Sequence, residues 1–203
     1  PGYAAYDTWN PVATSLETTI QNPTFQNNIN LFLNFKPMKG LSLKIMGGGT
    51  FSTSNNSKYE NLKTRNGNVM NGVGSINNSF DNRYQNTDIL TYDNTFGAHH
   101  LTFTGVVEYI TGKSIGNSMS GQDFLVDMLG TNNMDGAKSI SIDSWYSERT
   151  LMSYLGRLNY GLLDKYLVRL SYRADGSSVC GTNNKWGYFP SGSVAWRISQ
   201  EGF

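Results

Sequence analysis

The pattern of hydrophobic and polar residues is clearest over residues 166–175, where every second residue is apolar or aromatic and most of the others are polar. Even positions are apolar or aromatic: Tyr166, Val168, Leu170, Tyr172 and Ala174. Odd positions are Leu167, Arg169, Ser171, Arg173 and Asp175. A period of two predicts a β-strand. Its two mid-strand arginines require a wet or paired environment, and the wall of a transmembrane β-barrel offers lipid on one side and a polar lumen on the other.

Similar alternation elsewhere predicts seven strands in total. They cover residues 24–35, 41–53, 88–96, 101–109, 153–160, 166–175 and 188–198. Short segments at 36–40, 97–100 and 161–165 join six of these strands into three hairpins.

The remaining connections are long and polar. They span residues 54–87, 112–148 and 176–187, and the second contains one short apolar stripe that predicts a helix over 121–129. Short turns that alternate with long connections are typical of outer-membrane barrels, because one rim carries tight turns and the other carries extended loops. We therefore predict an all-β fold: an antiparallel up-and-down transmembrane β-barrel segment of about seven strands with long extracellular loops.

Composition narrows the function classes. The 203 residues have a net charge of +1 and only 15% charged residues, so the chain lacks the basic footprint of a nucleic-acid-binding protein. The single cysteine, Cys180, excludes an internal disulfide framework and a cysteine zinc cluster. No apolar run approaches the length of a membrane helix. The chain opens at Pro1 without an initiator Met or a signal peptide, and we expect it to be part of something longer.

The last third of the chain resembles the SusC/RagA family of TonB-dependent outer-membrane transporters. The resemblance is carried by five blocks in order: GRLNY at 156–160, DKYL at 164–167, RADGSS at 173–178, NNKWGYFPS at 183–191 and AWRIS at 195–199. It extends weakly over most of the chain and is strong after Met152. Val179 and Cys180 replace the basic and aromatic residues that the family usually has after the glycine-serine turn.

This resemblance implies a location in the bacterial outer membrane and a role in importing glycans, peptides or other oligomeric nutrients. It implies a SusD-like surface lipoprotein as partner, TonB as a partner of an N-terminal part that this sequence lacks, and outer-membrane lipid around the wall. Residues 1–203 are expected to form one partial β-barrel domain without a plug domain or N-terminal extension, and no cofactor is implied.

Four arginines are candidates for the lumen: Arg157, Arg169, Arg173 and Arg197. If the alternation holds, they face the lumen, where they line a polar path or pair with carboxylates of a plug domain. The alternative is that they form the solvated face of a soluble sheet.

Aromatic residues fall into two groups. The first lies near strand ends on the apolar face and predicts the interfacial girdles of a barrel, with a sandwich core as the alternative: Tyr154, Tyr160, Tyr166, Tyr172, Tyr188 and Trp196. The second lies in the expected loops and predicts contacts with an extracellular ligand, with loop anchoring as the alternative: Tyr59, Tyr84, Trp145, Tyr146 and Trp186.

Few residues form patterns that would indicate a catalytic or metal-binding site. His99 and His100 are adjacent in an expected turn with no third histidine to complete a metal site, and Asp123 and Asp127 have the spacing of a solvated helix face. We predict no enzymatic activity, no catalytic residue and no metal. The main alternative is a soluble or cell-surface carbohydrate-binding β-sandwich, which needs the same alternation but buries its apolar faces between two sheets. A β-rich glycosidase is a weaker alternative, since no pair of carboxylates stands out.

Overall fold

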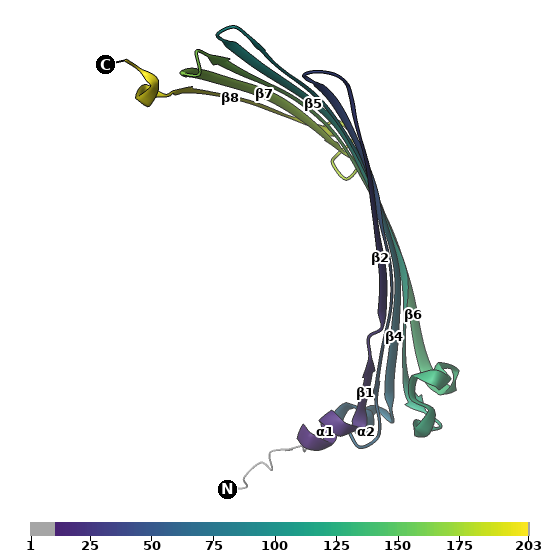
Figure 1. Cartoon of the computed structure of the whole chain (residues 1–203). Helices are drawn as coiled ribbons and strands as arrows, with labels where there is room; N and C mark the ends of the chain where they lie inside the picture. The colour runs from purple at the N-terminus through teal and green to yellow at the C-terminus, as the bar shows by residue number, and fades with distance from the viewer. Residues whose placement is uncertain (1–10, 203) are drawn as a thin grey trace. The chain divides into compact units, whose positions relative to one another are not determined.

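The computed structural model describes residues 11–202 and consists mostly of antiparallel strands (Figure 1). In chain order the elements are α1 Pro11–Glu17, β1 Thr18–Gln21, β2 Thr24–Met38, β3 Leu41–Glu60, α2 Arg65–Met70, β4 Val73–Phe96, β5 His99–Phe124, the 3-10 helix η1 Asp127–Gly136, β6 Ala137–Leu162, β7 Tyr166–Ser177, β8 Trp186–Trp196 and the 3-10 helix η2 Ile198–Gln200.

All eight described strands belong to one sheet. The order is β1-β3-β4-β5-β6-β7-β8, and β2 also pairs with β3. Neighbours in this order are also successive along the chain from β3 onward, which is the up-and-down topology that the sequence predicts. The all-β, antiparallel fold class is therefore confirmed.

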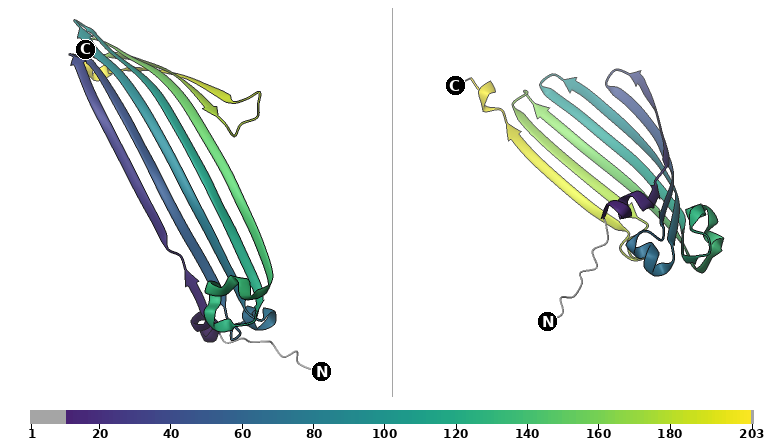
Figure 2. Two further views of the ribbon diagram at one scale, coloured as in Figure 1. Left: turned by 90° about the vertical axis from the view of Figure 1, so that its right-hand side faces the viewer. Right: turned by 90° about the horizontal axis from the view of Figure 1, so that it is seen from below.

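The three predicted hairpins are present, and their tight turns are visible at the ends of β2–β3, β4–β5 and β6–β7 (Figure 2). Gly40 and Gly97 occupy the first two turns with φ of 81° and 61°, values that glycine adopts without a steric penalty. Leu163 and Asp164 take similar positive φ values in the third turn.

The lengths of the strands and loops differ from the prediction. The segments 54–87 and 112–148 are mostly strand, because β4 has 24 residues and β5 and β6 have 26 each. What remains between strands there is residues 61–72 and 125–136, and each of these segments contains a short helix. The predicted helix at 121–129 is wrong, since β5 continues to Phe124 and η1 begins at Asp127. The eighth strand, β1, has only four residues and lacks a readable alternation.

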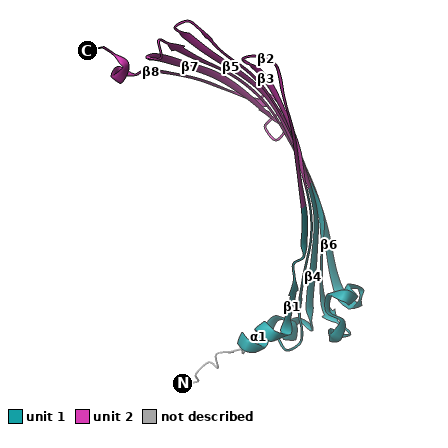
Figure 3. Ribbon diagram, viewed as in Figure 1, with its two compact units in different colours: residues 1–26, 51–81, 114–147 teal, residues 27–50, 82–113, 148–203 magenta. Residues whose placement is uncertain are grey.

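The chain divides into two compact units, shown in Figure 3: residues 1–26, 51–81 and 114–147, and residues 27–50, 82–113 and 148–203. The first unit holds the small hydrophobic core, in which Tyr59, Phe124, Met134 and Ala137 are buried. Here β1 pairs with the end of β3, from Thr18 opposite Glu60 to Gln21 opposite Ser57.

The second unit contains β2, β7, β8 and the three tight turns. Its most regular part is the ladder of β6, β7 and β8. Tyr166 lies opposite both Leu162 of β6 and Trp196 of β8, and the pairing continues without interruption to Gly176. This ladder fixes which side chains share a face.

Candidate functional site

The β6–β7–β8 ladder has one polar face and one aromatic face. Directly opposed residues in an antiparallel pair lie on the same side of the sheet. Arg169 lies opposite Asn159 and Ser193, and Arg173 lies opposite Leu155. We call this side the polar face. Its polar members are Ser153, Arg157, Asn159, Arg169, Ser171, Arg173, Asp175, Ser191 and Ser193, and it also carries Leu155, Leu167, Phe189 and Ala195. The other side is the aromatic face, formed by Tyr154, Leu158, Tyr160, Tyr166, Val168, Leu170, Tyr172, Trp186, Tyr188, Val194 and Trp196.

Stacked rings mark two outer levels on the aromatic face, and a third stack, Tyr172 on Tyr188 with ring centroids 6.2 Å apart, lies between them. Tyr166 and Trp196 stack with ring centroids 6.4 Å apart, and Tyr154 stacks on Trp186 at 5.9 Å. Trp196 lies opposite Tyr166 and Trp186 lies opposite Gly176, so the two levels are ten residues apart along β7. At about 3.3 Å per residue and a strand tilt of about 35–45°, they are separated by about 25 Å along the barrel axis. That is the height of the apolar band between the aromatic girdles of an outer-membrane barrel.

A carboxylate binds the level formed by Tyr166 and Trp196. Glu201 accepts hydrogen bonds from Lys165 Nζ at 2.9 Å, from the Tyr166 hydroxyl at 3.0 Å and from Trp196 Nε1 at 3.1 Å. The hydrogen bond from Lys165, followed by those from Trp196 and Tyr166, lowers the pKa of the Glu201 carboxyl. Glu201 thus satisfies the polar edges of two stacked rings whose flat faces stay apolar.

This arrangement predicts an acid-sensitive anchor for Trp196. A carboxyl with a lowered pKa stabilises the folded state when pH is above the ordinary glutamate value, and this contribution is lost as pH falls through the lowered pKa. In a variant that keeps Trp196 as its sole tryptophan, we expect the emission of Trp196 to shift to the red as pH falls through the lowered pKa of Glu201, below the ordinary glutamate value. Glu201→Gln should give the shifted spectrum already at pH 7 and remove the pH dependence. An identical pH response in both proteins would contradict the role of Glu201.

Arg173 forms an ion-pair network on the polar face. Its Nε atom donates to both carboxylate oxygens of Asp175, at 2.9 and 2.8 Å, and its Nη2 atom donates to Ser153 Oγ at 3.3 Å. Glu108 of β5 lies 3.8 Å from the same Nη2 atom. Ser153 is only 3% exposed, so this arginine is satisfied within the sheet.

The other three predicted arginines have no such partner. Arg169 donates from Nε to Asn159 Oδ1 at 2.8 Å, which leaves its terminal nitrogens free to bind. Across residues 11–202, no carboxylate forms an ion pair with Arg157, Arg169 or Arg197. Arg197 lies just beyond β8, and its backbone N–H bonds to the carbonyl of Lys165 at 2.8 Å.

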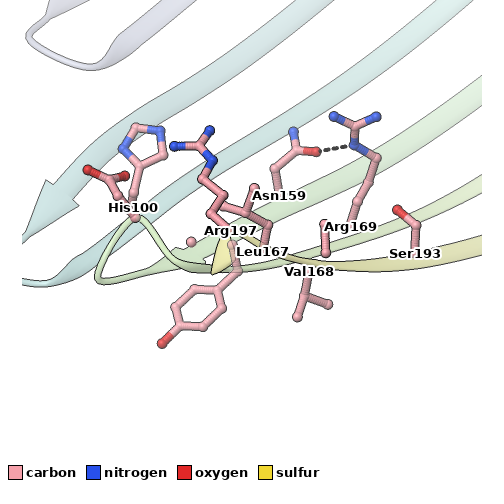
Figure 4. Close-up of a pocket in the computed structure, with 11 residues that line it drawn as sticks. His100, Asn159, Leu167, Val168, Arg169, Ser193 and Arg197 are labelled. Carbon is pink, nitrogen blue, oxygen red and sulfur yellow. Dashed lines mark hydrogen bonds between the residues drawn. The ribbon is translucent and has the colours of Figure 1, made fainter. Parts of the chain in front are cut away.

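Two of these arginines line a hollow on the polar face. Figure 4 shows the Arg169 and Arg197 guanidinium groups and the His100 ring on one side of the strands, with Val168 on the other side. Asn159 and Ser193 contribute neutral polar groups, and the hollow has a volume of about 470 Å³. It is within the size range of small-ligand pockets.

The aromatic residues predicted in loops lie in strands instead. Tyr59 is 4% exposed, packs edge-on against Phe124 with centroids 5.2 Å apart and donates from its hydroxyl to Asp127 at 2.8 Å. Trp186 begins β8 and stacks on Tyr154 on the aromatic face. The loop placement of these two residues is wrong, because the strands are longer than their apolar alternation indicates.

Tyr84 of β4 and Trp145 and Tyr146 of β6 are strand residues as well. Each is at least 40% exposed, so the predicted ligand contacts of these three stay a prediction. Trp145 covers Gly116 of β5 closely, and any side chain at that position would overlap its ring.

Sequence reasoning did not select Glu201, Asn159, Ser193 or His100 for any role at the site. The alternation places Asn159 and Ser193 on the polar side, and this was the available signal. Glu201 follows the last predicted strand, and nothing in its local sequence points to Trp196.

Two further observations concern membrane helices and metal ligands. No helix in the described part of the chain is long and apolar enough to cross a membrane. Among residues 11–202, no three His, Cys, Asp or Glu side chains are grouped so as to hold a metal ion.

Known proteins with similar sequences are TonB-dependent receptors. The chain is 29% identical over 201 residues to TonB-dependent receptor P3 of Formosa agariphila, an alignment that covers 96% of this chain and 20% of the relative. It is 47% identical over 60 residues to TonB-dependent receptor SusC of Bacteroides thetaiotaomicron, covering 30% of this chain and 6% of SusC. No protein-family model matches the chain.

Solved structures show the same fold. The RagAB peptide transporter matches 98% of this chain with a TM-score of 0.83 and 23% sequence identity, over 23% of the transporter chain. The open-open state of the RagAB peptide importer matches 95% with a TM-score of 0.81 and 24% identity, over 22% of that chain. The chain is therefore similar in sequence to TonB-dependent receptors, SusC included, and similar in fold to the RagAB transporter.

These similarities confirm the predicted resemblance to SusC and RagA, the fold of an outer-membrane β-barrel segment and the location in the outer membrane. The relatives are named as receptors and transporters, in agreement with the predicted absence of enzymatic activity. The chain spans about a fifth of the length of the curated receptors from Formosa agariphila that it matches.

Proposed function

We propose that the chain forms part of the wall of a TonB-dependent transporter that imports glycans or other oligomeric nutrients. The observation that carries this proposal is the division of the β6–β7–β8 ladder into two faces. One face presents apolar and aromatic residues with stacked rings at both ends, and the other presents mainly arginine, serine and asparagine. A wall between lipid and a hydrated lumen requires this division.

The partners in this proposal are a SusD-like lipoprotein at the outer rim and TonB at the periplasmic side. Both are implied by the similarity to SusC and RagAB, which are a receptor and a peptide transporter. In such a system, substrate captured at the outer rim passes through the lumen when a periplasmic pull opens the path. The described strands supply lumen polarity and lipid contact.

The rival function, carbohydrate binding by a soluble β-sandwich, has less support. A sandwich needs a second sheet over the aromatic face. Every described strand belongs to one sheet, and Leu170 and Val194 on the aromatic face are 53% and 82% exposed. Lipid is an occupant that fits such an uncovered face.

Spin labels on neighbouring residues of β7 test the proposal. In the full receptor that carries this segment, with exposed Cys180 changed to Ser, one nitroxide is attached at Leu170→Cys and, in a second protein, at Ser171→Cys. In lipid vesicles we expect the label at 170 to be accessible to oxygen but not to a water-soluble nickel chelate, because oxygen concentrates in hydrocarbon. The label at 171 should be accessible to the nickel chelate.

A barrel wall and a soluble β-sandwich give different results for the label at residue 170. A sandwich core would shield the label there from oxygen and from the nickel chelate alike, and that result would overturn the proposal. The label at 171 is the matched control, since it differs from 170 by one position and one face.

A further inference from the structure

We propose that the polar face binds solutes that carry several carboxylates, through three arginines that we call the arginine ladder: Arg197, Arg169 and Arg157. This inference rests on the proposed transport function and deepens it by naming a substrate class, the acidic oligomers. The three arginines share a face near the tight turn between β6 and β7, and the hollow of Figure 4 lies over two of them.

The register gives the spacing of the ladder. Arg197 bonds through its backbone to Lys165, Arg169 is itself on β7, and Arg157 lies opposite Ser171. Measured along β7, the three levels are therefore residues 165, 169 and 171. At about 3.3 Å per residue, the first step is about 13 Å and the second about 7 Å. A single carboxylate cannot bind both outer arginines, whereas a chain with repeated carboxylates can.

The ladder arginines differ from Arg173 in their partners. Arg173, only two residues from the last level of the ladder, is bound by Asp175 and lies near Glu108. The ladder arginines form no ion pair within residues 11–202. The sheet thus neutralises one arginine and leaves three in succession as donors. A guanidinium binds carboxylate through two parallel hydrogen bonds, which gives this geometry its preference for acidic groups.

Neighbouring groups prepare the hollow for an anion. The bond to Asn159 Oδ1 fixes Arg169 through Nε and leaves the two terminal nitrogens available. Ser193, opposite Arg169, adds a hydroxyl donor. Asp164 is the one carboxylate among the lining residues, and His100 is engaged by Thr95 at 2.9 Å and lies 3.5 Å from Asp93. Two permanent positive charges therefore face one negative charge in the hollow.

Calorimetric titration of the full receptor tests the ladder. The purified protein in detergent is titrated with trigalacturonate, with tri-aspartate and with neutral maltotriose. We expect both acidic trimers to bind and maltotriose to bind at least about tenfold more weakly, since each lost charged hydrogen bond is worth a factor of about ten or more. Binding of one acidic trimer only would assign the site to acidic glycans or to acidic peptides.

Substitutions assign the binding to the ladder. The double variant Arg169→Gln and Arg197→Gln should weaken acidic-trimer binding at least about tenfold. Arg169→Lys with Arg197→Lys keeps both charges and should retain part of the affinity. If the glutamine variant assembles poorly, this lysine variant replaces it as the test of the ladder. Arg149→Gln removes an arginine from the same strand as Arg157 and should leave binding unchanged.

The outcomes separate the ladder from the transport proposal. Equal binding of acidic and neutral trimers, or unchanged binding in the double glutamine variant, overturns the ladder. An equal loss in Arg149→Gln also overturns it, because binding would then reflect general charge. Energy-dependent uptake of a neutral oligomer in the same receptor supports transport whatever the ladder does, and absence of uptake for every solute overturns the transport proposal itself.

Discussion

Leu170→Arg is expected to destabilise the assembled barrel by about 2–4 kcal/mol, the cost of a lipid-facing arginine near the bilayer midplane. Leu170 lies opposite Leu158 and Gly192 on the aromatic face, between the levels marked by Tyr166 and Trp186. Its neighbours there offer no carboxylate, and water is absent from the surrounding hydrocarbon. The guanidinium would have to bend toward an interface to find polar partners.

Ser171→Arg is the matched control for this substitution. It introduces the same side chain one residue further along β7, on the polar face opposite Arg157 and Ser191. We expect a cost below about 1 kcal/mol, although the added charge lies near Arg157. Urea unfolding of the full receptor in lipid vesicles measures both. Equal losses from the two variants would contradict the assignment of the aromatic face to lipid.

Tyr59→Ala is expected to cost about 3–5 kcal/mol through loss of the aromatic ring from the only buried cluster among the described residues. The ring packs edge-on against Phe124, and three glycines approach it or its hydroxyl closely. A β-carbon added at Gly72 would lie 2.8 Å from the Tyr59 hydroxyl, and one at Gly74 would lie 3.0 Å from Met134 Sδ. The cluster is therefore shaped around Tyr59.

Tyr59→Phe separates packing from hydrogen bonding. It keeps the ring and removes the hydroxyl that donates to Asp127 at 2.8 Å, so we expect a loss of only about 1 kcal/mol. Hydrogen exchange of the amides in η1 and α2 reports the local effect of both variants, and urea unfolding reports the total. A loss in Tyr59→Phe as large as that in Tyr59→Ala would show that the hydrogen bond, and not the ring, holds the cluster.

The sequence predicts the β6–β7–β8 ladder well because both faces of these strands have strict environments. Lipid requires apolar residues at Val168 and Leu170, whereas the opposite side carries the arginines and only single apolar residues such as Leu167 and Phe189. Every second residue from 166 to 174 is therefore apolar or aromatic, and the turn between β6 and β7 is marked by the positive φ values of Leu163 and Asp164. These are the features that determine which residues share a face.

The parts of β3 to β6 that extend beyond the predicted strands were not predicted, because no apolar face is required there. Strand residues outside the apolar band meet water on both faces, so neither face needs to be apolar and the period of two disappears. The asparagine-rich residues of β4 are an example: they pair as strand without any amphipathic signal. Backbone hydrogen bonds between neighbouring strands hold these segments, and a single sequence does not display them.

The candidate site was predictable in part. Alternation alone places Arg157, Arg169 and Arg173 on one face, but it does not show that Arg173 is neutralised by Asp175 and lies near Glu108, a residue more than 60 positions away in the sequence. The same limit applies to Glu201, whose contacts with Tyr166 and Lys165 depend on the register of β7 and β8. Long-range pairing decides which charges remain available to a solute.

The excess length of β4, β5 and β6 has an evolutionary consequence. Each has 24 to 26 residues, whereas about 9–11 suffice to cross a bilayer. More than half of the residues of each strand therefore need not be apolar. Pairing with the neighbouring strands still fixes their register. Selection can vary side chains over those positions to suit new nutrients, and the portion that anchors the protein in lipid need not change.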